Sequence, residues 1–269
     1  MCFKRLSLIS GFLLSLLSAN SIAHTPFIAP ISFAPAHQQW VSLDAGFAET
    51  FFHPDVAFDK GDFKLLTPAG EWQKPSRIEM FTTRTLIEHQ LQEKGTYRFS
   101  TGTRYGAVFR FYELNGERKA TRDPKEILPK GAKLLDHYQS VTLAETYITF
   151  DKPTTEALKP QGKGLELIAI THPDDIYAGE NLSVQVLFDG KPLKDVQLTV
   201  YAANLVREKE EPYLRINTNT KGGADLLIKD AGVYLLHLRH TAVAPKGAEA
   251  PKYGYVYTLS FLVAPALDH

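Results

Sequence analysis

The chain has a single cysteine, Cys2, and it lies in the first few positions. If that segment is removed, as the pattern discussed below predicts, the mature protein holds no thiol. Disulfides, thiol catalysis, cysteine metal ligands and a lipid-anchored cysteine are then excluded. We therefore expect a fold that is indifferent to an oxidising compartment.

Enzyme motifs and an excess of charge are also lacking. The sequence has no glycine-rich phosphate loop, no G-x-S-x-G elbow and no H-E-x-x-H, and no pair among its scattered carboxylates stands out as an acid/base couple. With 30 Lys plus Arg against 30 Asp plus Glu, nothing favours attraction to nucleic acid. We predict a non-enzymatic protein without a nucleic-acid partner.

Long hydrophobic runs are missing as well. Lys4 and Arg5 precede a short apolar stretch, residues 6–17, and small residues follow at Ser21 and Ala23. This is the pattern of a cleaved secretory signal peptide, whereas a membrane anchor needs roughly 20 apolar residues. We expect residues 1–23 to be removed, so that the mature chain begins at His24 and does not insert directly into a membrane.

What the sequence has is a series of short segments in which apolar residues alternate with period two. Leu182, Val184, Val186 and Phe188 share one face, and residues 196–200 repeat the pattern. Such segments predict an all-β fold of two Ig-like β-sandwich modules in tandem, with little helix. The proline-containing residues 151–163 are predicted to link an N-terminal module, residues 24–150, to a C-terminal module, residues 164–269.

Turn residues refine this outline. Residues 189–192, DGKP, predict a hairpin that joins the strand ending at Phe188 to the strand at residues 196–200. The Asn115-Gly116 pair predicts another tight turn. The best candidates for helix are residues 124–128 and 203–211.

His24 is the sharpest candidate for a functional residue. A histidine at the mature N-terminus offers a free α-amino group together with an imidazole nitrogen, a chelate suited to copper, nickel or zinc. Free α-amino groups have pKa values near 7.7–8.0, so a metal displaces the proton at neutral pH without a large penalty. The alternative is that any residue can follow a cleavage site and that most N-termini fray.

The other histidines have simpler interpretations. His237 and His240 lie three apart on one predicted strand and therefore face opposite ways. His240 could lie at the rim of a sandwich, within reach of a terminus, or be a partly buried, hydrogen-bonded residue. His172 precedes a proline beside Asp174 and Asp175, which allows a metal ligand but also an ordinary turn.

Three tyrosines alternate on the last predicted strand. Tyr253, Tyr255 and Tyr257 share one face, which could stack against a sugar on an open sheet. Packing within a sheet, or between modules, explains the same stripe. Both interpretations stay open.

Several segments in fixed order resemble a known family. They are AHTPFIAP at the mature start, GKGLELIAITHPDDIYAGENLSVQVLFDGKPLKDVQLTV in the middle, TNTKGGADLLIKDAGVYLLHLRH after it, and a closing YTLSFLV. The set is similar to domain-of-unknown-function family 4198, the periplasmic nickel-uptake accessory domain. The resemblance implies a periplasmic protein of Ig-like modules, some of whose relatives accompany nickel or cobalt transporters. It also implies a histidine directly after the cleavage site, His24, and one ending a later strand, His240.

The preferred hypothesis is therefore a periplasmic metal-binding accessory protein. It would capture nickel or cobalt, with copper or zinc as alternatives, through His24 and His240, with His172 as a possible third ligand, and pass it to a membrane metal-uptake transporter. The main alternative is an Ig-like module that binds a glycan or a protein without metal. A copper oxidase built on an N-terminal histidine is a third hypothesis, but no substrate surface marks it.

Overall fold

The computed structural model describes residues 24–203 and 211–267, and within these ranges the chain is built almost entirely of strands. The predicted signal peptide, part of the second helix candidate and the last two residues lie outside them. The prediction of an all-β fold with Ig-like sandwiches is confirmed.

In the described part of the chain, helix is limited to two short 3-10 turns, His37–Gln39 and Glu156–Leu158. In the first helix candidate, residues 124–128, the first two residues form a turn and the others have no regular secondary structure. No helix in these ranges is long and apolar enough to cross a membrane.

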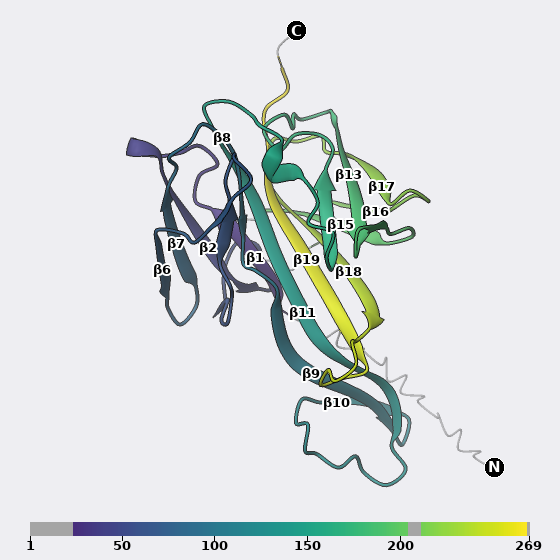
Figure 1. The fold of residues 1–269 in the computed structure, drawn as a ribbon. Coiled ribbons are helices and arrows are strands. Elements are labelled where there is room, and N and C mark those ends of the chain that lie inside the picture. Colours follow the sequence, from purple (N-terminus) through teal and green to yellow (C-terminus); the bar gives the residue numbers. More distant parts are fainter. Residues whose placement is uncertain (1–23, 204–210, 268–269) are drawn as a thin grey trace, which may run out of the picture.

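The strands form three sheets (Figure 1). The N-terminal sheet consists of β1 (Thr25–Pro30), β2 (Trp40–Ala48), β3 (Val56–Ala57), β6 (Arg77–Met80) and β7 (Thr85–Gln90). The C-terminal sheet consists of β12 (Leu165–Ala169), β13 (Asn181–Phe188), β14 (Lys191–Pro192) and β17 (Gly223–Leu227). The third sheet draws strands from both halves of the chain, and we call it the shared sheet.

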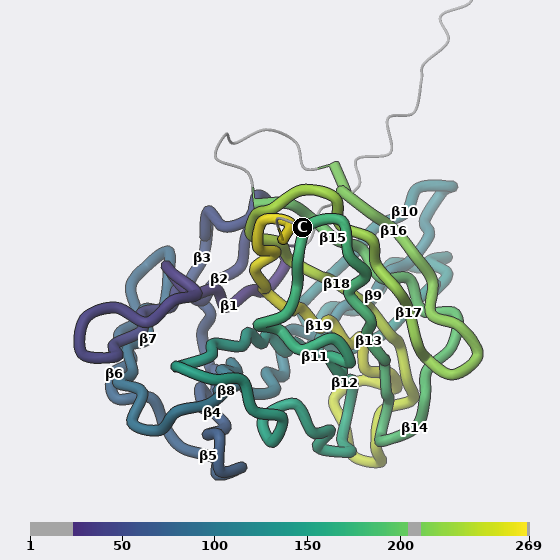
Figure 2. The backbone as a smooth tube through the Cα atoms, turned by 90° about the horizontal axis from the view of Figure 1, so that it is seen from above, coloured from purple at the N-terminus to yellow at the C-terminus, as the bar shows by residue number. Residues whose placement is uncertain are grey.

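The shared sheet has ten strands. They are β4 (Lys64–Leu66), β5 (Trp72–Gln73), β8 (Gly95–Ser100), β9 (Arg104–Leu114), β10 (Glu117–Thr121), β11 (Lys133–Phe150), β15 (Gln197–Ala202), β16 (Leu214–Asn217), β18 (Gly232–Val243) and β19 (Lys252–Val263). The two halves join where β11 pairs in parallel with β19, from Gln139↔Tyr253 to Thr146↔Ser260. Figure 2 shows β11 and β19 between the N-terminal strands on one side and the C-terminal sheet on the other.

Each face of the shared sheet carries its own core. Because neighbouring residues of a strand point to opposite faces, β11 sends Ala144 and Ile148 into the core against the N-terminal sheet and Tyr147 into the core against the C-terminal sheet. Leu158, within the predicted linker, is buried in the second core. Residues 151–163 are thus packed against the sandwich, and the division into two modules stays a prediction.

The two predicted turns have different outcomes. Asn115 and Gly116 form the turn between β9 and β10, both with positive φ (54° and 78°), as a tight hairpin requires. The hairpin predicted between residues 182–188 and 196–200 is wrong. β13 pairs with β14, whereas β15 joins the shared sheet. The apolar faces of β13 and β15 are buried in the same core from opposite sheets, an arrangement that strand periodicity cannot distinguish from side-by-side pairing.

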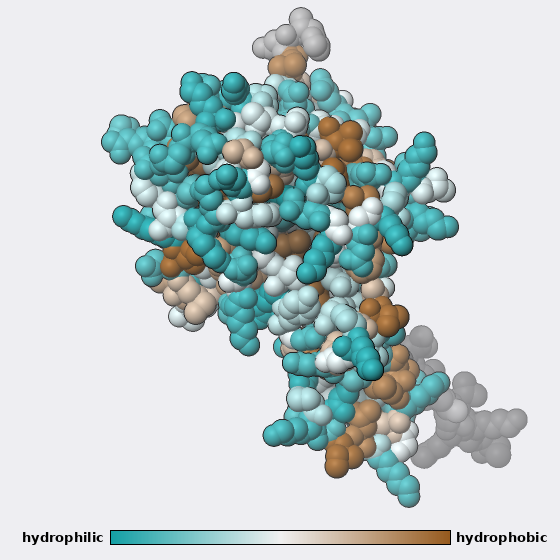
Figure 3. All heavy atoms as spheres, in the orientation of Figure 1, coloured by the Kyte–Doolittle hydropathy of each residue, from teal (hydrophilic) through white to brown (hydrophobic). Residues whose placement is uncertain are grey.

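One part of the shared sheet extends beyond both sandwiches. It is formed by β9, β10 and the first half of β11 (Figure 1), and Figure 3 shows apolar surface gathered on it. Its exposed apolar residues include Leu134 and Leu135. Phe109, Phe111 and Tyr138 stack on one another there, with Arg118 and Arg122 over the two phenylalanines.

Candidate functional site

His24 lies directly before β1, with its ring between two carboxylates. Its Nε2 is 3.6 Å from Oε1 of Glu49, and its Nδ1 is 3.7 Å from Oδ2 of Asp55. The side chains of His24 and Glu49 are 44% and 57% exposed, and that of Asp55 is 21% exposed. A cation at this position therefore stays open to solvent.

Strand pairing explains why these residues meet. β1 runs antiparallel to β2 with Thr25 opposite Ala48, so His24 lies beside the segment that follows β2. That segment folds back on β2, because the amide of Asp55 donates to the carbonyl of Phe47. The amide of Glu49 donates to Oδ2 of Asp55 at 3.0 Å and fixes this carboxylate in place. Two hydrogen bonds thus hold the acidic segment at the end of β2, beside the start of β1.

The spacing of these atoms suits a shared transition-metal ion. Nitrogen and oxygen ligands lie about 2.0–2.2 Å from such an ion, so two ligands of one ion are about 3–4 Å apart. The 3.7 Å between Nδ1 of His24 and Oδ2 of Asp55 falls in this range. Glu49 lies beside the other ring nitrogen, which points away from an ion held in this way. Within residues 24–203 and 211–267, however, no group of three or more His, Cys, Asp and Glu side chains could hold a metal ion. A complete site at His24 needs a donor besides these side chains.

The structure does not bring His240 to His24. His240 is paired with Tyr255 of β19 and packs on Phe188 of the C-terminal sheet, with ring centroids 4.7 Å apart. Thr258, three residues further along β19, points to the other face, where its hydroxyl donates to the carbonyl of Pro26 in β1. His240 and β1 therefore lie on opposite faces of the shared sheet. Burial lowers the pKa of His240.

The contacts of His172 also involve residues other than His24. Its Nδ1 accepts the amide of Asp174, so Nε2 carries the proton and lies 3.1 Å from both the carbonyl of Thr154 and the hydroxyl of Thr96. The ring ties the start of the C-terminal half to residues 151–163 and to β8. Both ring nitrogens are occupied by these structural contacts.

Glu49 and Asp55 were not predicted from the sequence, and His237 was predicted only to face away from His240. His237 is paired with Thr258 and so lies on the same face as β1, with its ring 6.5 Å from that of Tyr201. Burial and the nearby Arg239 lower its pKa to about 3, so it is a neutral imidazole at physiological pH. The alternation of residues 232–240 separates His237 from His240, but only the position of β1 shows which face meets the N-terminus.

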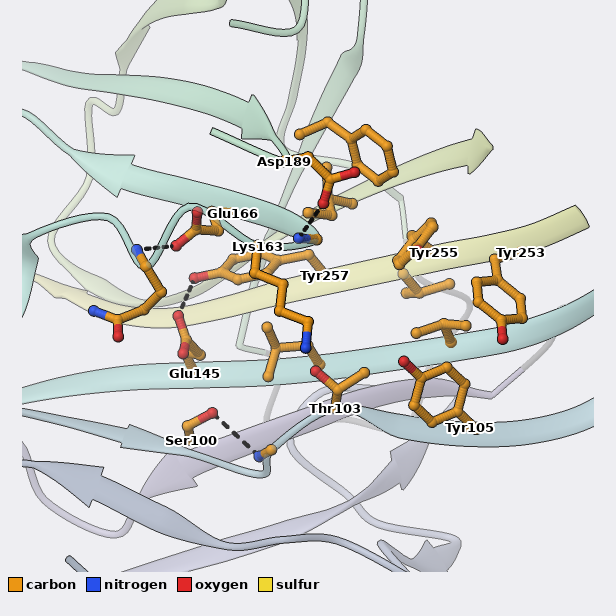
Figure 4. Close-up of a pocket in the computed structure, with 18 of the residues that line it drawn as sticks. Ser100, Thr103, Tyr105, Glu145, Lys163, Glu166, Asp189, Tyr253, Tyr255 and Tyr257 are labelled. Carbon is orange, nitrogen blue, oxygen red and sulfur yellow. Dashed lines mark hydrogen bonds between the residues drawn. The ribbon is translucent and has the colours of Figure 1, made fainter. Parts of the chain in front are cut away.

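The tyrosine stripe borders a cavity of about 770 Å³ on the opposite face of the shared sheet (Figure 4). Tyr253 and Tyr255 line it together with Tyr105 of β9, while Tyr257 is buried and donates to Glu145. The stripe therefore serves both purposes: Tyr257 packs inside the protein, and Tyr253 and Tyr255 form part of the cavity wall. Binding of a sugar to it stays a prediction.

The fold and these two sites define an all-β protein of Ig-like sandwiches that share a sheet. The chain belongs to the family described as Domain of unknown function (DUF4198), whose model matches residues 21–242. The family resemblance predicted from the sequence is confirmed. The link of this family to nickel uptake stays a prediction. No curated protein matches the chain.

Three solved structures illustrate what the fold is similar to. The D0-D1 domain of Intimin is 12% identical, with 87% of this chain and 96% of that chain covered and a TM-score of 0.21. A marsupial T cell receptor is 13% identical over 91% and 74%, with a TM-score of 0.22. The FN1-FN3 domains of chicken CNTN1 are 11% identical over 89% and 99%, with a TM-score of 0.21. Likeness of this degree carries no argument about function.

Proposed function

We propose that the protein is a periplasmic accessory protein that captures a transition-metal ion, nickel or cobalt by preference, at its mature N-terminus and passes it to a membrane metal-uptake transporter. The observation that carries the proposal is the position of the His24 ring between the carboxylates of Glu49 and Asp55. Imidazole and carboxylate groups together suit divalent transition metals.

Each residue has a defined role in this site. If the chain is cleaved before His24, its α-amino group and Nδ1 form one chelate, because the two nitrogens belong to the same residue. Asp55, 3.7 Å from Nδ1, adds an oxygen ligand. Glu49, whose Oε1 is 3.6 Å from Nε2, lies beside the ring nitrogen that is not coordinated and orients the ring through its negative charge.

The α-amino group supplies the donor that the side chains lack. No set of three metal-binding side chains exists in the described ranges. The α-amino group and Nδ1 of His24 and the carboxylate of Asp55 together give three donors. Further positions on the ion are left for water or for a ligand of the receiving transporter. An exposed site with open positions is suited to transfer, because a second protein can bind the ion before the first releases it. His240 and His172 have no part in this site.

Titration calorimetry of the correctly processed protein with nickel, cobalt, copper and zinc tests the proposal. We expect one ion per chain, tighter than about 10 μM, which corresponds to about −7 kcal/mol. His24→Ala and a Gly-Ser extension before His24 should each abolish binding, since the first removes the ring and the second removes the chelating amine. Asp55→Asn should weaken it.

His37→Ala serves as the matched control, because His37 is an exposed histidine in the first 3-10 turn. Its affinity should equal that of the unmodified protein. Binding that survives the N-terminal extension unchanged would place the metal elsewhere and refute the chelate. A mature N-terminus other than His24, read by mass spectrometry, would refute it as well.

A further inference from the structure

The cavity on the other face of the shared sheet has cationic donors that lack acceptors. Arg98 of β8 lines it and is only 2% exposed, and neither its Nε nor its Nη2 has a hydrogen-bond partner. The nearest carboxylate oxygen, Oε1 of Glu145, is 4.0 Å from Nε. Buried N–H groups without partners cost free energy, which a ligand with acceptor oxygens would recover.

Two lysines add to this positive charge. Lys163 extends into the cavity toward Thr103 (Figure 4). Lys64 lies over the ring of Trp72, with Nζ 4.3 Å from the ring centroid, and the Arg98 guanidinium lies 5.4 Å from the same ring. Neither lysine forms an ion pair with a residue of the described ranges. Three cations thus surround one space.

The carboxylates of the cavity are already engaged by the protein. Glu166 accepts the amides of Gln161 and Gly162 through its two oxygens. Asp189 accepts the amide of Gly164 at 2.8 Å. Glu145 accepts the hydroxyl of Tyr257 at 2.7 Å. The unmatched groups of the cavity are therefore donors, and they favour an anionic ligand over a cation.

The other end of the cavity is aromatic. Tyr105 is 53% exposed, and its ring centroid is 5.5 Å from that of Tyr253, which in turn is 6.0 Å from that of Tyr255. Ser100 and Thr103 also contribute hydroxyls to the lining of the cavity. A ligand that fits has a ring with an apolar face, hydroxyl groups along its edge and a negative group.

We propose that this cavity binds an acidic saccharide, whose sugar ring stacks on Tyr105 and whose carboxylate is held by Arg98 and Lys163. The volume, about 770 Å³, lies within the ~300–1,000 Å³ of small-molecule sites and accommodates more than one sugar unit. The site is independent of the metal proposal, because the cavity and β1 lie on opposite faces of the shared sheet.

Fluorescence titration of the mature protein tests this inference, since Trp72 borders the cavity and covers two of its cations. The probes are glucuronic acid, a trimer of galacturonic acid, glucose and benzoate. We expect both uronic acid probes to bind, the trimer more tightly, and glucose to bind at least about tenfold more weakly, because hydrogen bonds to charged groups contribute about 1.5–3 kcal/mol. A terminal-sugar site would instead bind monomer and trimer equally, which still supports the cavity as an acidic-saccharide site.

Two variants at exposed positions locate the binding without disturbing the core. Lys163→Met should weaken glucuronic acid binding about tenfold, and Tyr105→Ala about fivefold through lost stacking. Lys152→Met, an exposed lysine of the same segment, is the control and should leave affinity unchanged. His24→Ala should also leave it unchanged, which separates this test from that of the metal site.

Four results overturn the inference. Equal affinity for glucose and glucuronic acid removes the role of the carboxylate, and binding of benzoate in place of the uronic acids removes the saccharide. Absence of binding by any probe at millimolar concentration, or affinities unaffected by both Lys163→Met and Tyr105→Ala, removes the site.

Discussion

The two faces of the shared sheet present opposite chemistry. On the face of β1, an exposed imidazole lies between two carboxylates that are anchored but open to solvent. On the other face, a buried guanidinium has N–H groups without acceptors, while the nearby carboxylates are used within the protein. One side is therefore suited to a cation that must be released, and the other to an anion. The first site belongs to the N-terminal sheet and the segment after β2, which pack against one face of the shared sheet, whereas the second lies on the opposite face of the shared sheet.

The buried charge pair of the cavity face should have the largest effect on stability. Arg98→Met leaves Glu145 buried without its cation, and we expect the free energy of unfolding to fall by about 3–5 kcal/mol. Chemical denaturation measures this. Adding Glu145→Gln should restore much of the loss, because a glutamine carbonyl still accepts the Tyr257 hydroxyl. A loss below about 1 kcal/mol for Arg98→Met would show that the pair is not desolvated and would weaken the contrast between the faces.

The segment that covers the cavity face offers the next test. Leu158 is 8% exposed and belongs to the core against the C-terminal sheet. Leu158→Ala should lower the free energy of unfolding by about 2–4 kcal/mol, as for other buried leucines. Lys152→Ala, at an exposed position of the same segment, should change it by no more than about 0.5 kcal/mol. Equal, small effects of both substitutions in denaturant titrations would show that residues 151–163 are a free linker.

The strands and their alternation could be predicted from the sequence, but the pairing of distant strands could not. The period-two pattern of residues 182–188 identifies β13 and its buried side. It carries no information on whether β15 lies beside β13 or opposite it, because either arrangement buries the same residues. The parallel pairing of β11 with β19 joins segments more than 100 residues apart and leaves no local signal.

The candidate site was predictable to the same extent. His24 follows from the cleavage pattern, and the opposite orientation of His237 and His240 follows from their spacing. Whether His237 or His240 lies on the side of His24 depends on the position of β1. The structure places β1 on the face of His237. Glu49 and Asp55 reach His24 only through the pairing of β1 with β2. Acidic residues after a strand are too common to be singled out in advance.

His237 makes the face of β1 sensitive to acid. Its pKa is lowered to about 3 by burial and by Arg239, whereas an unfolded histidine takes up its proton near pH 6.5. The unfolded chain therefore binds more protons as the pH falls below about 6.5, so the free energy of unfolding decreases, by about 1–2 kcal/mol between pH 7 and pH 5. His237→Gln should flatten this dependence in thermal unfolding across that range, while His37→Gln should not. An unchanged profile in His237→Gln would mean that the ring takes up its proton at a similar pH in the folded and the unfolded chain.

The smallest expected effect concerns Glu49, and it distinguishes a ligand from a residue that orients a ligand. Glu49 faces Nε2 of His24, on the side of the ring away from the proposed chelate. Glu49→Gln should reduce nickel affinity about tenfold, the lower limit for loss of such an outer carboxylate, with the stoichiometry unchanged in calorimetry. Glu79→Gln, at an exposed position of β6, is the control. If Glu49→Gln abolished binding while Asp55→Asn did not, the ion would lie on the Nε2 side of the ring, and the α-amino group, which chelates only with Nδ1, would no longer belong to the site.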